Sequence, residues 1–229
     1  RQSQLGTWVA SDGPRPAREA VGPPGPYNAA TDAPSAARRM PEESMVRLVP
    51  SLGIAVALSL APLAAAAFSL ESAEIKPNAR IADAQVYNGF GCTGGNISPS
   101  LAWKNAPAGT KSYAITVYDP DAPTGSGWWH WVVFNLPAST KSLPVGAGDG
   151  SGSKLPPGTV ESRTDFGKPG WGGPCPPQGD KPHRYIFTVY ALKTDKLELA
   201  ADSPAAMVGF MINANKLGKA SFTATYGRK

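Results

Sequence analysis

The chain has few of the residues that metal sites and disulfide-rich scaffolds require. Only two cysteines and two histidines occur among its 229 residues. Two cysteines exclude a disulfide-dense scaffold and a zinc site made of four thiolates. Two histidines leave few candidates for acid–base chemistry or metal ligation. The surroundings of these histidines therefore carry most of what the sequence says about function.

Charge is also sparse. Charged residues make up 17% of the chain, and the formal net charge of +5 comes without a run of lysines and arginines. A nucleic-acid-binding protein usually concentrates positive charge on one face, so the composition argues against a nucleic-acid partner. The hydrophobic fraction of 41% over this length is enough for one sizeable core.

Glycine and proline, with 25 and 24 residues, are abundant but unevenly spread. Residues 1–44 are rich in proline, glycine and alanine and have no apolar period. Such a segment buries too little surface to offset its ordering entropy, so we expect it to be disordered. Met45 follows it directly and is a plausible initiator, so an upstream segment that is not naturally translated is the other interpretation.

Residues 45–67 have the layout of a secretory signal peptide. Arg47 supplies a positive charge, an almost wholly apolar run covers 48–63, and four alanines follow at 64–67. This pattern predicts cleavage before Phe68 and a periplasmic or secreted product with no membrane span after processing. The alternatives are a retained membrane anchor, for which the run is short, and a buried core helix.

Residues 68–229 alternate between polar and apolar side chains, which indicates strands. The connections are rich in glycine and proline, most of all in 144–158 and 167–182. Several strands joined by such loops favour a mainly β fold, an antiparallel β-sandwich. The predicted strands are 111–118, 129–136, 184–192 and 221–226, with shorter candidates at 84–87 and 100–103.

One helix is predicted near the end of the chain. Ser203 is a suitable N-cap and Pro204 a suitable first helical residue. A stripe of apolar residues then recurs at spacings of three and four, which predicts that this face packs on the core. The stripe consists of Met207, Phe210, Met211, Ala214 and Leu217.

Two stiff loops precede the two histidines. The first runs from Asp119 to Pro123, contains two prolines and leads to His130. The second is the Gly/Pro-rich segment 172–182, which leads to His183. Prolines fix the backbone and withhold N–H donors, so these loops present their side chains rigidly. Each histidine is either a satisfied structural residue or part of a site.

A site of this composition can hold a small anion. His130, His183 and Tyr185 would donate hydrogen bonds, while Asp119, Asp121 or both would orient an imidazole or keep it protonated. Tyr185 follows His183 by two residues, so both side chains lie on one face of the predicted strand.

These two segments, 119–130 and 173–185, resemble the two signature regions of the phosphatidylethanolamine-binding protein family. The chain is most similar to its bacterial, Raf-kinase-inhibitor-like branch. The similarity extends over nearly all of 68–229, including the stretch 90–103.

The resemblance implies a large antiparallel sheet packed against a smaller one, with a C-terminal helix. It also implies a non-catalytic pocket, without a cofactor, for phosphate-like anions or phosphoryl and phospholipid head groups. The residues that match the family's pocket are Asp119, Pro123, His130, His183 and Tyr185, with Asp121 bracing the turn and Trp128 and Trp129 at the rim.

Other functions fit parts of the sequence. His130, His183 and Asp119 could form a metal site of a hydrolase, and Cys175 with His183 could form a nucleophilic pair. Alternatively, the long 144–182 region could serve as an interaction surface that inhibits a kinase or a protease.

Export would place Cys92 and Cys175 in an oxidising compartment, and these are the chain's only thiols. We therefore predict a disulfide between them, with two separate buried thiols as the alternative. The overall expectation is an exported binding protein that is a monomer or a weak dimer.

Overall fold

The computed structural model describes residues 66–229. The predicted disordered segment, 1–44, lies outside the described residues. So does the predicted signal peptide at 45–67, apart from residues 66 and 67. Within residues 66–229, no helix is both long and apolar enough to cross a membrane. The described part contains three sheets, a helix and two apolar clusters.

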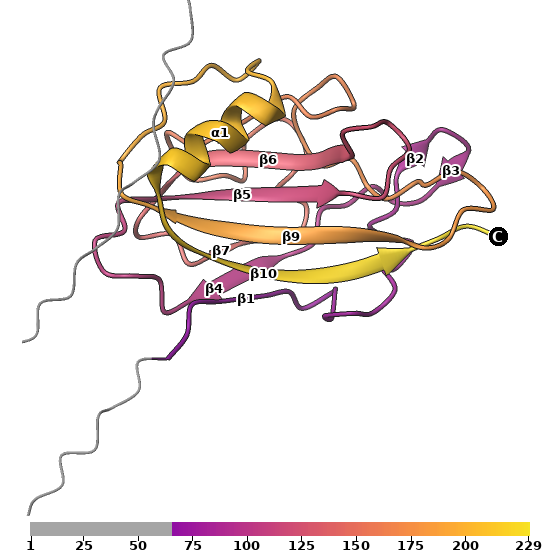
Figure 1. The fold of residues 1–229 in the computed structure, drawn as a ribbon, viewed down its shortest axis with the longest axis horizontal. Coiled ribbons are helices and arrows are strands. Elements are labelled where there is room, and N and C mark those ends of the chain that lie inside the picture. Colours follow the sequence, from indigo (N-terminus) through magenta and orange to yellow (C-terminus); the bar gives the residue numbers. More distant parts are fainter. Residues whose placement is uncertain (1–65) are drawn as a thin grey trace, which may run out of the picture. The chain divides into compact units, whose positions relative to one another are not determined.

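A five-stranded antiparallel sheet dominates the fold (Figure 1), with the strand order β10-β9-β5-β6-β8. A three-stranded antiparallel sheet, in the order β1-β4-β7, packs against it, and β2 and β3 form a separate hairpin. The large sheet comprises β5 (Ser112–Asp119), β6 (Trp128–Pro137), β8 (Val160–Glu161), β9 (His183–Leu192) and β10 (Lys216–Tyr226); the other strands are β1 (Ser69–Glu71), β2 (Asn88–Gly89), β3 (Cys92–Thr93), β4 (Leu101–Lys104) and β7 (Ser142–Leu143).

The main core lies between the large and the small sheet. Alternate residues of β5 and β9 point into it, because successive side chains of a strand face opposite sides of the sheet. Tyr113, Tyr185 and Phe187 are buried there together with Trp103 of β4 and Trp131 of β6. The antiparallel sandwich predicted from alternation is thus confirmed.

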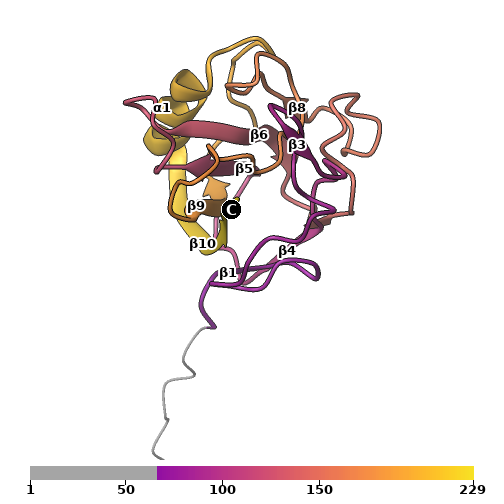
Figure 2. The ribbon, with the colours of Figure 1, turned by 90° about the vertical axis from the view of Figure 1, so that its right-hand side faces the viewer.

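The helix α1 (Ala205–Asn215) covers the other face of the large sheet (Figure 2). Its buried residues Ala205, Val208 and Ile212 join a second apolar cluster with residues such as Val132 and Phe134 of β6. The helix near the C-terminus is confirmed, but β10 follows it and ends the fold.

The predicted orientation of the helix is wrong. The stripe of Met207, Phe210, Met211, Ala214 and Leu217 does not pack on the core: Met211 is half-buried and the other four residues are exposed. The helix contains no charged residue, so a second stripe with the same spacing, which starts at Ala205, was equally available to face the sheet.

Two local predictions also fail. Ser203 does not cap α1, because Pro204 occupies the N-cap position and no side chain bonds the first turn. Residues 84–87 are a turn and not a strand, since the Gln85 and Val86 N–H groups bond the nearby carbonyls of Ala82 and Asp83 at 3.0 and 3.2 Å.

The predicted disulfide is confirmed. Cys92 of β3 is bonded to Cys175 in the loop before β9, across a sequence separation of 83 residues. The bond ties the β2–β3 hairpin to the second of the two stiff loops.

Candidate functional site

The first stiff loop begins at Asp119, the last residue of β5. Its Oδ1 atom accepts hydrogen bonds from the backbone N–H groups of Asp121 at 2.8 Å and Ala122 at 3.1 Å. An aspartate that bonds its own backbone two residues ahead stabilises a tight turn. Asp119 is itself 2% exposed, so the turn is anchored inside the protein.

Asp121 fastens the same turn to the start of β9. Its carboxylate accepts hydrogen bonds from the backbone N–H of Arg184 at 2.9 Å, from Arg184 Nε at 2.8 Å and from Nη2 at 2.7 Å. These bonds lower the pKa of Asp121 to about 2. Asp121 therefore stays ionised and braces the turn, as the resemblance predicted, but it does not line the pocket below.

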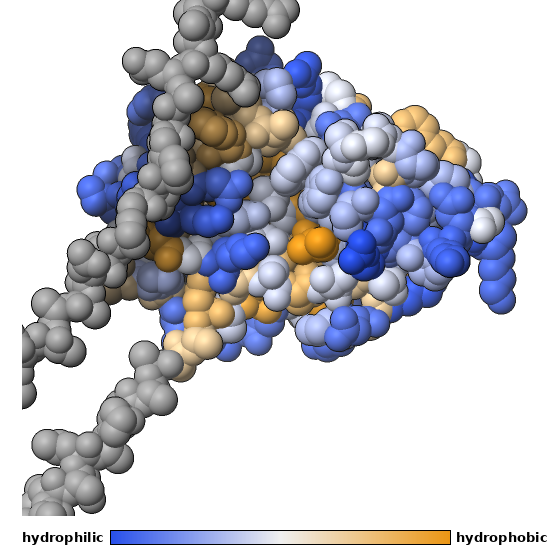
Figure 3. Space-filling view, in the orientation of Figure 1, coloured by the Kyte–Doolittle hydropathy of each residue, from blue (hydrophilic) through white to orange (hydrophobic). Residues whose placement is uncertain are grey.

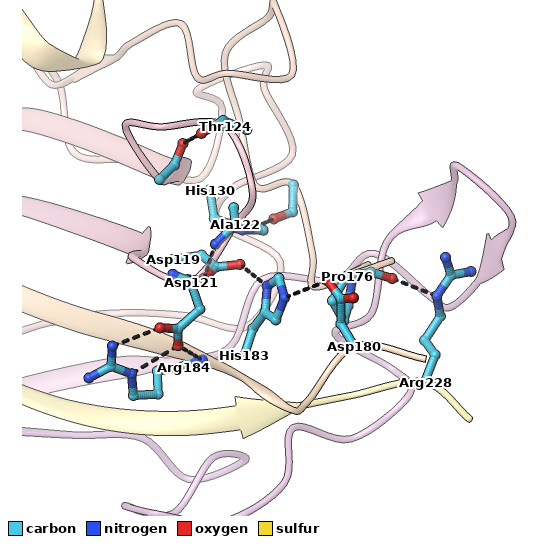
Figure 4. A network of polar contacts seen from close by, with 12 residues as sticks. Asp119, Asp121, Ala122, Thr124, His130, Pro176, Asp180, His183, Arg184 and Arg228 are labelled. Atoms are coloured by element: carbon cyan, nitrogen blue, oxygen red, sulfur yellow. Dashed lines mark hydrogen bonds and ion pairs between the residues drawn. The ribbon is translucent and has the colours of Figure 1, made fainter. Parts of the chain in front are cut away.

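His183 is the first residue of β9 and lies between two carboxylates (Figure 4). Its Nδ1 atom is 2.8 Å from Asp119 Oδ2, and its Nε2 atom is 3.4 Å from Asp180 Oδ2. A carboxylate only accepts, so Nδ1 donates to Asp119. Asp119 is thus the orienting acceptor that the sequence predicted for one of the two histidines.

His130 reaches the site through a bulge in β6. Val117 pairs with Trp131 and Tyr118 pairs with Trp129, which leaves His130 without a partner on β5. A bulge re-aims the side chain of the extra residue, and bulges are frequent beside functional sites. Here the bulge turns the imidazole of His130 toward the second stiff loop.

Gly172 of that loop fixes the tautomer of His130. The imidazole Nδ1 lies 2.6 Å from the Gly172 carbonyl oxygen, which can only accept, so Nδ1 carries a proton. Burial lowers the pKa of His130 from 6.5 to about 4. The ring is therefore neutral near pH 7. Its Nε2 atom is an acceptor that is shielded from solvent and has no partner among residues 66–229.

Tyr185 lies behind His130. The two rings meet edge to face with centroids 5.0 Å apart, and Tyr185 is completely buried. Burial raises the pKa of its phenol far above the ordinary value of 10.0, so the hydroxyl keeps its proton. That hydroxyl, like His130 Nε2, has no hydrogen-bond partner.

A pocket of about 170 Å³ opens between the two stiff loops. Asp119, His130 and His183 supply its polar wall. The remaining wall is mostly apolar and comes from the two stiff loops, the β2–β3 hairpin, the start of β6 and the segment after β8: Phe90, Ala122, Pro123, Thr124, Trp128, Phe166, Cys175, Pro176 and Pro177.

Phe166 is the centre of an aromatic group on this wall. Its ring centroid is 5.5 Å from that of Trp128, 5.4 Å from that of His130 and 6.0 Å from that of Phe90. Gly172 permits this packing, since a Cβ atom there would lie 2.2 Å from the Phe166 ring. The glycines of the second loop therefore serve both the His130 contact and the aromatic wall.

The structure brings together most of the predicted pocket residues. Asp119, Pro123, Trp128, His130 and His183 line the pocket. Tyr185 stands behind His130 instead of lining the cavity.

Trp129 is not a rim residue. It packs on Tyr118 with ring centroids 4.6 Å apart and joins the apolar cluster under α1. Neighbouring residues of a strand face opposite sides, so Trp128 and Trp129 could not both reach the rim.

Sequence reasoning missed Phe90, Phe166, Pro176 and Pro177 as wall residues. Phe90 and Phe166 are 76 positions apart in the numbering and meet only through the folded loops. Pro176 and Pro177 lie in the second stiff loop, so the rigidity of that loop was the local signal that could have indicated them as wall residues.

The two catalytic alternatives meet specific obstacles. Cys175 is in the disulfide, so it offers no thiolate for a pair with His183. Among residues 66–229, no three His, Cys, Asp or Glu side chains are grouped so that they could hold a metal ion.

Comparison with known proteins gives the family context of this fold. A family model described as phosphatidylethanolamine-binding protein matches residues 71–227. The UPF0098 protein YbcL of Escherichia coli K12 is 57% identical over 162 residues, which cover 71% of this chain and 88% of YbcL. YbhB of the same organism is 50% identical over 157 residues, which cover 69% of this chain and 98% of YbhB.

Solved structures agree. The crystal structure of E. coli YbcL, described as a new member of the mammalian PEBP family, has a TM-score of 0.70 at 56% identity and covers 72% of this chain and 100% of that chain. A homologue from Chlamydia trachomatis has a TM-score of 0.59 at 27% identity and covers 71% of this chain and 99% of that chain.

Proposed function

The chain belongs to the phosphatidylethanolamine-binding protein family, and on that premise we propose that it is a non-catalytic binding protein for phosphate-like anions or phosphoryl head groups. The ligand would enter the pocket between the two stiff loops and contact His130 and His183. The matches above support a binding protein of this family; the non-catalytic role and the class of ligand are the proposal.

One observation carries this proposal. His130 Nε2 and the Tyr185 hydroxyl are buried, and neither has a hydrogen-bond partner in the described part of the chain. A buried polar atom without a partner costs about 1–3 kcal/mol, so unpaired groups beside a cavity favour a ligand that pairs them. A tetrahedral oxyanion offers several oxygens in a small volume. One of these oxygens would bond His130, which lines the pocket, and the His130 ring would shift enough for another to reach the Tyr185 hydroxyl behind it.

Pocket size and wall chemistry narrow the ligand. About 170 Å³ is well below the roughly 300–1,000 Å³ of pockets that enclose drug-sized ligands. The bound group is therefore a small ion or the head of a larger molecule. The aromatic and proline wall favours an ester with an apolar substituent over a fully hydrated ion.

Binding of such a group requires one extra proton. Neutral His130 presents Nε2 as an acceptor, so an anion oxygen can bond it only if the imidazole gains a proton or the ligand brings one. The nearby anion would raise the His130 pKa, because an opposite charge favours the charged form.

Tyr185→Phe gives the cleanest test. The substitution removes a hydroxyl that bonds nothing in the free protein, so stability should hold or rise, while affinity for phosphate and phosphoethanolamine falls by about tenfold. Isothermal titration of residues 68–229 measures both affinities. Tyr113→Phe is the matched control, because Tyr113 is an equally buried tyrosine far from the pocket whose hydroxyl bonds Lys141. Unchanged affinity in Tyr185→Phe would refute the anion pocket.

We also propose export to the periplasm or beyond, on the basis of the charge, apolar run and alanines in residues 45–67. Expression from Met45 should yield a product that begins at or near Phe68. N-terminal sequencing of the periplasmic protein tests this, and a product that keeps residues 52–60 in the membrane fraction contradicts it.

A further inference from the structure

Helix α1 carries no charged side chain on any face. Its sequence from Ala205 to Asn215 is apolar except for a pair of asparagines at 213 and 215. A helix that is apolar all round is normally buried on all sides. Only one side of α1 is buried here, where Val208 and Ile212 pack on the large sheet.

The outer face of α1 is exposed and almost entirely apolar. Met207 is 50% exposed and Phe210 is 67% exposed, and Ala206 and Ala214 lie beside them in the open. Leu217, just beyond the helix, is 41% exposed. Figure 3 shows this apolar surface over α1, next to hydrophilic atoms. Contiguous exposed apolar surface of this kind marks an interaction site.

Lysines gather at the C-terminal end of the helix. Lys216 follows Asn215 directly, and its Nζ atom bonds Asn213 Oδ1 at 2.7 Å. The backbone N–H of Lys193 donates to the Asn215 carbonyl at 2.9 Å. Lys219 lies opposite Tyr190, on the face of the sheet that α1 covers.

The nearby acidic residues do not neutralise the lysines at the C-terminal end of α1. Asp195 is already paired with Lys111 at 3.5 Å. Glu198 and Asp202 lie further along the connection that leads back to the start of α1. Within residues 66–229, Lys193, Lys216 and Lys219 have no ion-pair partner, so positive charge borders the exposed apolar face at one end.

From this combination we propose that the outer face of α1 docks on an anionic lipid surface. Phe210 and Met207 enter the apolar edge of the bilayer, and Lys193, Lys216 and Lys219 reach the lipid phosphates. Apolar side chains with flanking lysines are what peripheral membrane helices use, since burial of apolar area and attraction to anionic lipid add together. This surface is separate from the anion pocket, because α1 covers the opposite face of the sheet.

The test uses residues 68–229, the proposed mature product, and two kinds of vesicle. One is equimolar phosphatidylglycerol and phosphatidylcholine, and the other is phosphatidylcholine alone. We expect at least tenfold stronger co-sedimentation with the anionic vesicles, and weaker binding at high salt because exposed charges are screened.

Variants locate the contact. The double variant Met207→Gln/Phe210→Gln should weaken binding to the anionic vesicles at least tenfold. Each of the single variants Lys216→Ala and Lys219→Ala should weaken it about fivefold. Ile97→Gln and Val145→Gln are matched controls, since these residues are 43% and 45% exposed and belong to another surface. Tyr185→Phe, which changes a buried residue behind His130 and leaves α1 untouched, should bind vesicles like the parent.

Thermal unfolding shows whether each variant keeps its fold. We expect that it does, because the changed residues are exposed. A parent protein that ignores anionic vesicles overturns the proposal, as does equal vesicle binding by the α1 variants and the parent. A parent dimer that the α1 variants dissociate, without vesicle binding, assigns this face to a second copy of the chain and also overturns it.

Discussion

The Nδ1 atom of His183 lies 2.8 Å from Oδ2 of Asp119, and the two side chains are only 5% and 4% exposed. The other carboxylate oxygen of Asp119 holds the turn after β5. One buried aspartate therefore sets both the shape of the first stiff loop and the orientation of a pocket histidine.

The substitution Asp119→Asn should disturb both the first stiff loop and the orientation of His183. The amide offers one acceptor oxygen in place of two, so either the turn or the His183 N–H loses its partner. We expect a loss of about 1–3 kcal/mol in the free energy of unfolding, together with weaker phosphate binding. Urea unfolding measures the first. Asp83→Asn is the control, because this carboxylate is 79% exposed and should change stability by less than about 0.5 kcal/mol.

His130 should make the stability of the ligand-free protein depend on pH. Burial lowers its pKa in the folded state to about 4, below the 6.5 of the unfolded chain. Between these values the unfolded state binds more protons, so acidification favours unfolding. Up to about 3 kcal/mol should be lost as the pH falls from 6.5 to 4.

The matched variant is His130→Gln, which does not titrate. Subtracting its stability profile from that of the parent isolates the contribution of His130. Parallel profiles between pH 4 and 6.5 would show that His130 is not held neutral by burial.

Anion binding should depend on the protonation of His130 as well. Sulfate is the better probe because it stays a dianion across this range, so its own charge does not change. Its affinity should rise as the pH falls, and binding at pH 6 should take up protons because the anion raises the His130 pKa. Calorimetry in buffers of different ionisation enthalpy measures the uptake, and sulfate affinity that is flat with pH would contradict this prediction.

Reduction of the disulfide should destabilise the protein. The bond between Cys92 and Cys175 closes a loop of 83 residues, which corresponds to about 4 kcal/mol on the chain-entropy account. The variant with both cysteines changed to serine should match the reduced parent in urea unfolding. Thiol titration of unreduced, denatured protein should find no free thiol, whereas two per chain would rule the bond out.

Strands were predictable wherever alternation continues over many residues. The limits of β5, β6 and β9 differ from the predicted ones by at most one residue at each end, because one face of each strand must meet the core. The turn at 84–87 and the outward stripe of α1 were not predictable, since their apolar residues fit two arrangements and long-range packing selects one.

The candidate site also has one part that could be predicted from the sequence and one part that could not. Rigid loops beside histidines gave Asp119, His130 and His183 from local sequence. The bulge that aims His130 depends on the register of β6 against β5, and the contact of Phe90 with Phe166 depends on the folding of two distant loops. No local pattern carries such relationships.

The central claim is that a bound anion pairs the free Nε2 atom of His130. Nitrogen NMR of the imidazoles tests it directly, and with two histidines in the chain the spectrum is simple to assign. In the free protein at pH 6, His130 should be the neutral form with the proton on Nδ1. Saturating phosphate should convert Nε2 of His130 to a hydrogen-bonded N–H, and an unchanged His130 spectrum in the phosphate-bound protein would contradict the account.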